Sequence, residues 1–83
     1  MLSLNYDEKY DVLYIGLSDR SNSPGDDEYG GLVVFRDELS DDITGLTVFG
    51  FFEKYKKQSL PKWPDGISID TEREILPYIA KHV

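Results

Sequence analysis

Short apolar runs bounded by turn residues place the tightest limit on what this chain can fold into. The clearest run, Val12–Leu17 (VLYIGL), is rich in β-branched and aromatic residues and is too short for a helix. Leu2–Tyr6 alternates apolar and polar residues, as a half-buried strand does. Tyr29–Asp37 and Ile43–Phe51 have the same strand character. Local connections make an antiparallel meander of about four strands the simplest arrangement, with the doubly apolar Val12–Leu17 in a central position.

The second half of the chain changes character and predicts helices. Phe51–Gln58 spaces its aromatic residues for a short helix with lysines on the opposite side, or else it extends the fourth strand. Thr71 and Glu74 fit a capping box at the start of a C-terminal helix, in which Pro77 predicts a kink or a second helix start. The predicted fold class is therefore α+β, with a small antiparallel β-meander, a short helix after strand four and a C-terminal helix.

The length and the residue types limit the class of protein. The chain has 83 residues, and we expect residues 1–83 to form a single domain. It contains no cysteine, which excludes disulfides, thiolate nucleophiles and cysteine-based zinc sites and fits a cytoplasmic protein. The first residues lack the pattern of a signal peptide, and no apolar stretch approaches the roughly 18 residues of a membrane span.

The charge is acidic and unevenly placed. The net charge is −7, and residues 1–50 carry three cations and eleven anions, a balance of −8. Residues 51–83 carry six cations and five anions, a balance of +1. An acidic surface repels phosphate, so the composition argues against nucleic acid as a partner. It suits solubility, or docking onto a basic protein.

The turn between the first two predicted strands gathers acids and tyrosines. Asp7, Glu8 and Asp11 cluster there, and Asp19 follows the second strand. We interpret them as turn residues, because aspartate accepts backbone N–H hydrogen bonds in tight turns. The alternative is a hydrolase that uses Asp7, Asp11 or Asp19. The tyrosines of this stretch are predicted to pack as cross-strand aromatics rather than to donate protons: Tyr6, Tyr10 and Tyr14.

No other set of residues predicts a reaction. His82 stands alone near the C-terminus, and neither a nucleophile motif nor a phosphate-binding loop is present. Ser18–Glu28 contains Ser, Asn, Pro, Gly and acidic residues with no apolar residue, and it predicts a loop. This acidic loop does not have the spacing of a calcium-binding EF-hand. The alternative that remains is a weak cation site at Asp26, Asp27 and Glu28. We therefore predict no catalytic residue, no cofactor and no metal.

Residues 54–63 form a basic–aromatic stretch that has two interpretations. Cations beside stacking rings suit single-stranded nucleic acid. The other interpretation is amphipathic packing, in which the rings cover the core and the lysines face water. The acidic first half of the chain favours packing. The residues concerned are Lys54, Tyr55, Lys56, Lys57, Lys62 and Trp63.

The run from Tyr6-Asp7 through Asp11-Val12-Leu13-Tyr14-Ile15 to Leu17-Ser18 resembles the signature of domain of unknown function 2283, a family of short prokaryotic proteins. Gly31–Val34 and Gly45–Val48 stand where that family has its later strands. The resemblance covers about residues 4–57 and leaves 59–83 as a C-terminal extension. Phe35 and Arg36 depart from it, since many members have an acid there. The resemblance implies no activity.

Together these features predict a small non-enzymatic protein-interaction module, with no membrane contact. We expect it to act as a homodimer or as an acidic partner of another protein. The alternative is nucleic-acid binding through residues 54–63. The candidate interaction residues are Tyr6, Asp7, Tyr10, Asp11, Tyr14, Lys54, Tyr55, Lys57 and Trp63.

Overall fold

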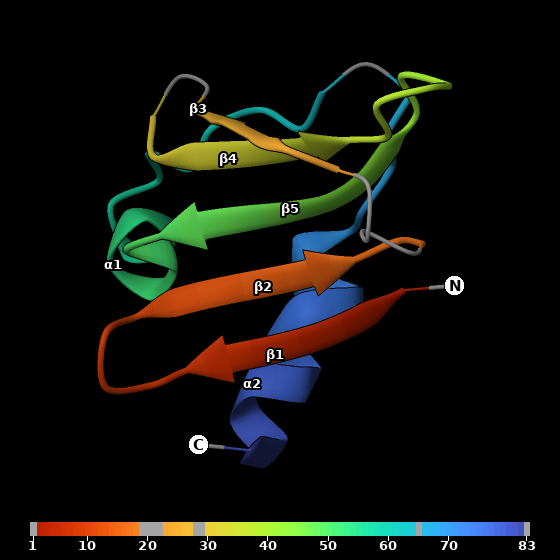
Figure 1. Ribbon diagram of the computed structural model, residues 1–83. Helices are drawn as coiled ribbons and strands as arrows, with labels where there is room; N and C mark the ends of the chain where they lie inside the picture. The colour runs from red at the N-terminus through yellow and green to blue at the C-terminus, as the bar shows by residue number, and fades with distance from the viewer. Residues whose placement is uncertain (1, 19–22, 28–29, 65, 83) are drawn as a thin grey trace.

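A computed structural model describes residues 2–18, 23–27, 30–64 and 66–82 of the chain (Figure 1). These residues form an antiparallel sheet with the strand order β1-β2-β5-β4-β3. The strands are β1 (Ser3–Asp7), β2 (Val12–Gly16), β3 (Gly25–Asp27), β4 (Leu32–Arg36) and β5 (Ile43–Phe49). The helices are α1 (Phe51–Lys56), the π-helix η1 (Thr71–Ile75) and α2 (Leu76–His82). The predicted α+β class is confirmed, as are the short helix after the sheet and the C-terminal helix.

The predicted four-stranded meander is wrong in both strand number and strand order. The sheet has five strands among the described residues, and β5 lies in its middle, paired with β2 on one side and β4 on the other. Five successive residues of β5, 44–48, are buried. Because β5 pairs with a strand on each side, the backbone N–H and C=O groups of these buried residues have hydrogen-bond partners. At the edge of the sheet, half of these groups would have none. β2 is an interior strand as predicted, but its neighbours are β1 and β5.

The additional strand, β3, lies in a stretch that the sequence predicts as loop. Gly25, Asp26 and Asp27 have low strand propensity, and their side chains are exposed. Pairing with β4 makes this segment a strand, with Asp26 opposite Val34. A short acidic strand at the edge of a sheet discourages pairing with further strands.

One face of the sheet carries the core, and the helices lie on that face. Figure 1 shows α2 behind the sheet, with β1 passing in front of it. Successive side chains of a strand point to opposite faces, so alternate residues of β2, β4 and β5 reach the core. Partly buried apolar side chains from the C-terminal extension pack on the same core: Leu60, Trp63, Ile67 and Ile69. The described part of this extension therefore packs on its own chain. The buried core residues are Leu13, Ile15, Leu32, Val34, Leu46, Val48, Phe51, Ile75 and Ile79.

The C-terminal helical segment has its cap one residue earlier than predicted. Asp70, not Thr71, caps η1: its carboxylate accepts N–H bonds from Glu72 (3.1 Å) and Arg73 (3.2 Å). The Glu74 carboxylate in turn accepts the N–H of Asp70 at 2.8 Å. This reciprocal pair spans four residues instead of three, because η1 has the wider turn of a π-helix.

Candidate interaction site

Asp11 joins the turn between β1 and β2 to the start of α1. Its backbone is left-handed, with φ 56°, a conformation that aspartate tolerates. Its carbonyl accepts N–H bonds from Gly50 (2.7 Å) and Phe51 (3.1 Å). Its carboxylate accepts N–H bonds from Phe52 (2.8 Å) and Glu53 (3.1 Å). Gly50 has no side chain to cap α1, so Asp11 satisfies the first N–H groups of the helix from a distant part of the chain.

Tyr6 completes this arrangement, which we call the Asp11 junction (Tyr6, Asp11 and residues 50–53). The Tyr6 hydroxyl donates to the Asp11 carboxylate at 2.6 Å. Burial raises the pKa of Tyr6 well above its ordinary value, and its hydrogen bond to Asp11 and the charge of that carboxylate raise it further. Burial also acts to raise the pKa of Asp11, but hydrogen bonds from Tyr6 and α1 outweigh it and lower that pKa. A catalytic role for the Asp11 carboxylate would therefore disrupt the cap of α1.

The three tyrosines do not form the predicted cross-strand set. Tyr6 packs against the core. Tyr14 lies opposite Asn5, the residue next to Tyr6 in β1, so the Tyr14 ring lies on the other face of the sheet. The period of two along a strand therefore separates the two rings. Tyr10 lies in the turn and is 67% exposed. Its N–H donates to the Asp7 carboxylate at 3.2 Å, so Asp7 has the turn role predicted for it.

The remaining acids form no metal site in the part of the chain that the structure describes. No group of three histidine, aspartate or glutamate side chains lies close enough there to hold an ion. Asp26 and Asp27 are exposed on β3. Asp19, Glu28 and the side chain of His82 lie outside the described residues.

The basic–aromatic stretch is divided between α1 and the loop that follows. Lys54 Nζ donates to the carbonyl of Phe49 at 2.6 Å, and Lys57 Nζ pairs with the Glu53 carboxylate at 3.0 Å. Trp63 packs against the core. Trp63 therefore agrees with the packing interpretation, whereas Tyr55 is not among the residues that pack against the core and lines a groove instead. The nucleic-acid alternative remains a prediction.

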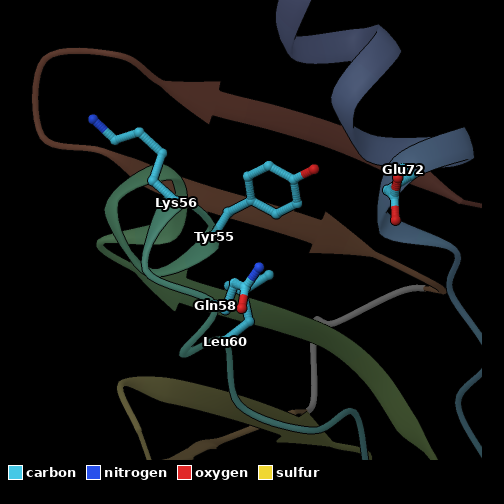
Figure 2. Close-up of a pocket in the computed structure, with 5 residues that line it drawn as sticks. All are labelled: Tyr55, Lys56, Gln58, Leu60 and Glu72. Carbon is cyan, nitrogen blue, oxygen red and sulfur yellow. The ribbon is translucent and has the colours of Figure 1, made fainter.

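A groove of about 450 Å³ lies between α1 and η1. In Figure 2 the Tyr55 hydroxyl points across the groove toward Glu72, whereas Lys56 extends away from it. The lining offers one phenol, one ammonium group, one amide, one acid and one apolar side chain. The lining residues are Tyr55, Lys56, Gln58, Leu60 and Glu72.

The opposite face of the sheet has a different character, and no helix of the described residues covers it (Figure 1). Its central side chains come from three neighbouring strands and are uncharged. We call them the open sheet face: Val12 and Tyr14 of β2, Thr47 and Phe49 of β5, and Val33 and Phe35 of β4. Tyr14 is 38% exposed and Phe49 48%. Antiparallel sheets commonly present polar residues on the side that faces water, so this surface is unusual.

Sequence reasoning found Tyr14 but missed the other residues of the open sheet face. A signal was present, since Val12–Leu17 is apolar on both faces. A strand of that kind needs a cover on each side, and the helices supply one cover only. The strand order that brings Val33 and Phe49 near Tyr14 is not readable from local pattern, because it depends on β5 entering the middle of the sheet.

Comparison of the chain with protein-family models, curated proteins and solved structures finds no significant match. The resemblance to domain of unknown function 2283 therefore remains a prediction. Its first motif has a structural explanation here, because Tyr6, Asp7 and Asp11 hold the turn and the cap of α1. Among the described residues, no helix has the length and apolar character that crossing a bilayer requires.

Proposed function

We propose that this chain is a small non-enzymatic protein-interaction module whose contact surface is the open sheet face. The observation that carries the proposal is the exposure of two aromatic rings, Tyr14 and Phe49, on an uncharged face of the sheet. Aromatic residues dominate the binding energy of protein interfaces. Contiguous exposed apolar surface on a soluble domain commonly marks an interaction site.

The roles of the other candidate residues support the same proposal. Tyr6, Asp7 and Asp11 bind one another or the backbone of their own chain. Lys54 and Lys57 also have partners within the protein. Side chains with these internal partners are poorly placed to bind a ligand. Tyr10 lies in the β1–β2 turn, Tyr55 lines the groove and Trp63 packs against the core. Tyr14 is therefore the sequence-predicted residue that lies on the open sheet face.

Photo-crosslinking in the cells that make the protein tests this proposal. A photoreactive phenylalanine analogue replaces Tyr14 in one variant and Leu39 in the matched control. Leu39 is 92% exposed, but it lies in the β4–β5 turn, at the opposite end of β5 from Phe49. We expect a discrete crosslinked protein species from position 14 and none from position 39. Equal labelling at the two positions, or no product at position 14, would contradict the proposal.

A further inference from the structure

We propose that the occupant of the open sheet face is a second copy of this chain, stacked with its own open sheet face against the first. This inference rests on the proposed function, since it names the partner of the same surface. It makes the assembly a symmetric dimer with two sheets inside and the helices outside. Sheets that pack in this way lie about 10 Å apart, with their strands nearly aligned.

Charge favours an uncharged partner surface at the centre of the contact. The chain carries −7, yet the six residues of the open sheet face include no acid. The described acids that share this side, Asp7 and Asp27, lie on the edge strands β1 and β3. A basic partner would bury cations over a centre that offers them no counter-charge, which is costly. A second open sheet face has no charge to bury there.

The relief of the surface is self-complementary. Phe49 lies beside Val12, and Tyr14 lies beside Thr47, across the β2–β5 pairing. Tyr14 and Phe49 carry large rings that are 38% and 48% exposed, whereas Val12 and Thr47 carry small side chains that neighbouring residues of their own chain already cover, at 6% and 4% exposed. Large and small side chains therefore alternate in both directions on the four central positions. Interdigitation of this kind is what two stacked sheets need at their contact.

A two-fold axis that runs between β2 and β5, parallel to the strands, uses this alternation. It places β2 of one copy over β5 of the other at the same level along the strands. Phe49 of each copy then lies over Val12 of the second copy, and Tyr14 lies over Thr47 of the second copy. One rotation satisfies all four contacts, as an isologous dimer requires.

The size of the face predicts a weak dimer. This two-fold axis overlaps β1, β2, β5 and β4 of the two copies. Four strands about 4.8 Å apart and about 17 Å long give a flat footprint of roughly 300 Å² per copy, before side-chain relief is counted. A standard protein interface buries about 800 Å² per partner. We therefore expect association in the micromolar range rather than the nanomolar range.

The net charge gives the dimer a distinctive dependence on salt. Two copies of −7 each repel one another, and salt screens that repulsion. Raising NaCl from about 50 mM to about 500 mM should therefore strengthen the dimer. Binding to a basic partner would weaken over the same range.

Sedimentation equilibrium of the purified full chain tests the inference. The wild type should form a dimer of twice 9.5 kDa between about 10 µM and 1 mM, and more so at high salt. F49E should raise the dissociation constant roughly 30-fold or more, because it buries a charge at a central aromatic contact. L39E, which makes the same charge change on an exposed apolar residue, should leave it within about twofold. Circular dichroism confirms folding, and Y14S replaces F49E if that variant unfolds.

A mixing experiment tests the two-fold arrangement itself. Y14K and T47E, each checked for folding by circular dichroism, should dimerise more weakly than the wild type, and an equimolar mixture should recover a dimer. In the mixture, Lys at position 14 of one copy lies over Glu at position 47 of the other. A mixture no more associated than its components would overturn this arrangement.

The outcomes separate this inference from the proposed function. A wild type that stays monomeric at about 1 mM overturns the second copy as partner. Crosslinks from position 14 to a different protein would then leave the proposed function standing. Dimerisation that F49E and Y14S do not change overturns the inference by placing the contact elsewhere. If position 14 also gives no crosslink, the proposed function fails with it.

Discussion

The Asp11 junction and the open sheet face are opposite in chemical character. The junction is rich in ionisable and polar groups, and its groups bind one another: the Asp11 carboxylate alone accepts three hydrogen bonds. The six side chains of the open sheet face are uncharged, and two of them are exposed aromatic rings, Tyr14 and Phe49. The first region resembles a site in the sequence and holds the fold together. The second has no motif, and it offers the surface on which a partner can lie.

A polar cluster in a small domain can serve the fold rather than a ligand. A carboxylate is informative about function when it lacks a structural partner, and Asp11 has several. An aromatic ring is informative when it is exposed in the middle of a sheet, as Tyr14 is. We therefore expect changes at the junction to alter stability without altering association, and changes on the open sheet face to do the reverse.

The largest expected effect on stability follows Asp11→Ala. The change removes the cap of α1 and places alanine in a left-handed conformation that it adopts poorly. We expect the free energy of unfolding to fall by about 2–3 kcal/mol, as measured by urea denaturation. Asp7→Ala is the control, because it removes a single exposed turn contact and should cost about 0.5 kcal/mol. Equal losses for the two variants would contradict the capping role.

Tyr6→Phe should have the next largest effect. It removes one hydroxyl that donates to the Asp11 carboxylate and leaves the ring in place. Removing one partner of such a hydrogen bond costs about 1 kcal/mol or somewhat more. Tyr10→Phe is the matched control and should change the stability by less than about 0.5 kcal/mol. Urea denaturation of the two variants side by side separates these outcomes.

Tyr6 also predicts how stability responds to alkali. Its pKa is raised in the folded protein above the ordinary value of 10.0, so its contribution is complete below pH 10. Above that pH the unfolded chain ionises more readily, and the contribution is lost as the pH rises through the folded pKa. Tyr6→Phe should flatten this part of the curve. An unchanged alkaline slope would argue against the hydrogen bond.

A smaller effect is expected in acid. The pKa of Asp11 in the folded protein is below its ordinary value of 3.8, so its contribution is complete above that value and is lost as the pH falls through the folded pKa. Asp11→Asn should reduce the slope of stability against pH below about pH 4. Some slope should remain, because hydrogen bonds from the N–H groups of Ser40 and Leu39 also lower the pKa of Asp37. Thermal melts of the wild type and Asp11→Asn between pH 2 and pH 7 measure the slope that is lost and the slope that remains.

The smallest expected effect on stability follows F49E. Phe49 is half exposed and lies at the end of β5, outside the buried core. Surface substitutions of this kind stay within about 0.5 kcal/mol. A loss of 2 kcal/mol or more would mean that Phe49 supports the fold, and the separation of the two regions would fail.

The sequence predicted the elements better than their arrangement. The four apolar runs are strands, because short β-branched segments fit a pleated sheet in any order. The place of β5 depends on long-range pairing, which no local pattern encodes. β3 was missed since backbone pairing with β4 alone makes Gly25–Asp27 a strand. Pro77 marked a real boundary, because the π-helix gives way to α2 one residue before it.

The candidate site was predictable only in part. The turn role of Asp7 followed from the chemistry of aspartate in turns. The cap that Asp11 gives α1 was not predictable, since about forty residues separate them and only the folded sheet brings them together. Tyr14 was identified, but the alternation of large and small residues around it required the register of β2 against β5.

Sedimentation equilibrium of the wild type, Asp11→Asn and F49E at one concentration and one salt shows which of the two regions holds the dimer together. Asparagine tolerates the left-handed backbone at position 11, so that variant should fold. We predict that the wild type and Asp11→Asn associate alike, while F49E is monomeric. Dissociation of Asp11→Asn together with an unaffected F49E would contradict the account, because it would make the acidic junction the interface and the open sheet face inert.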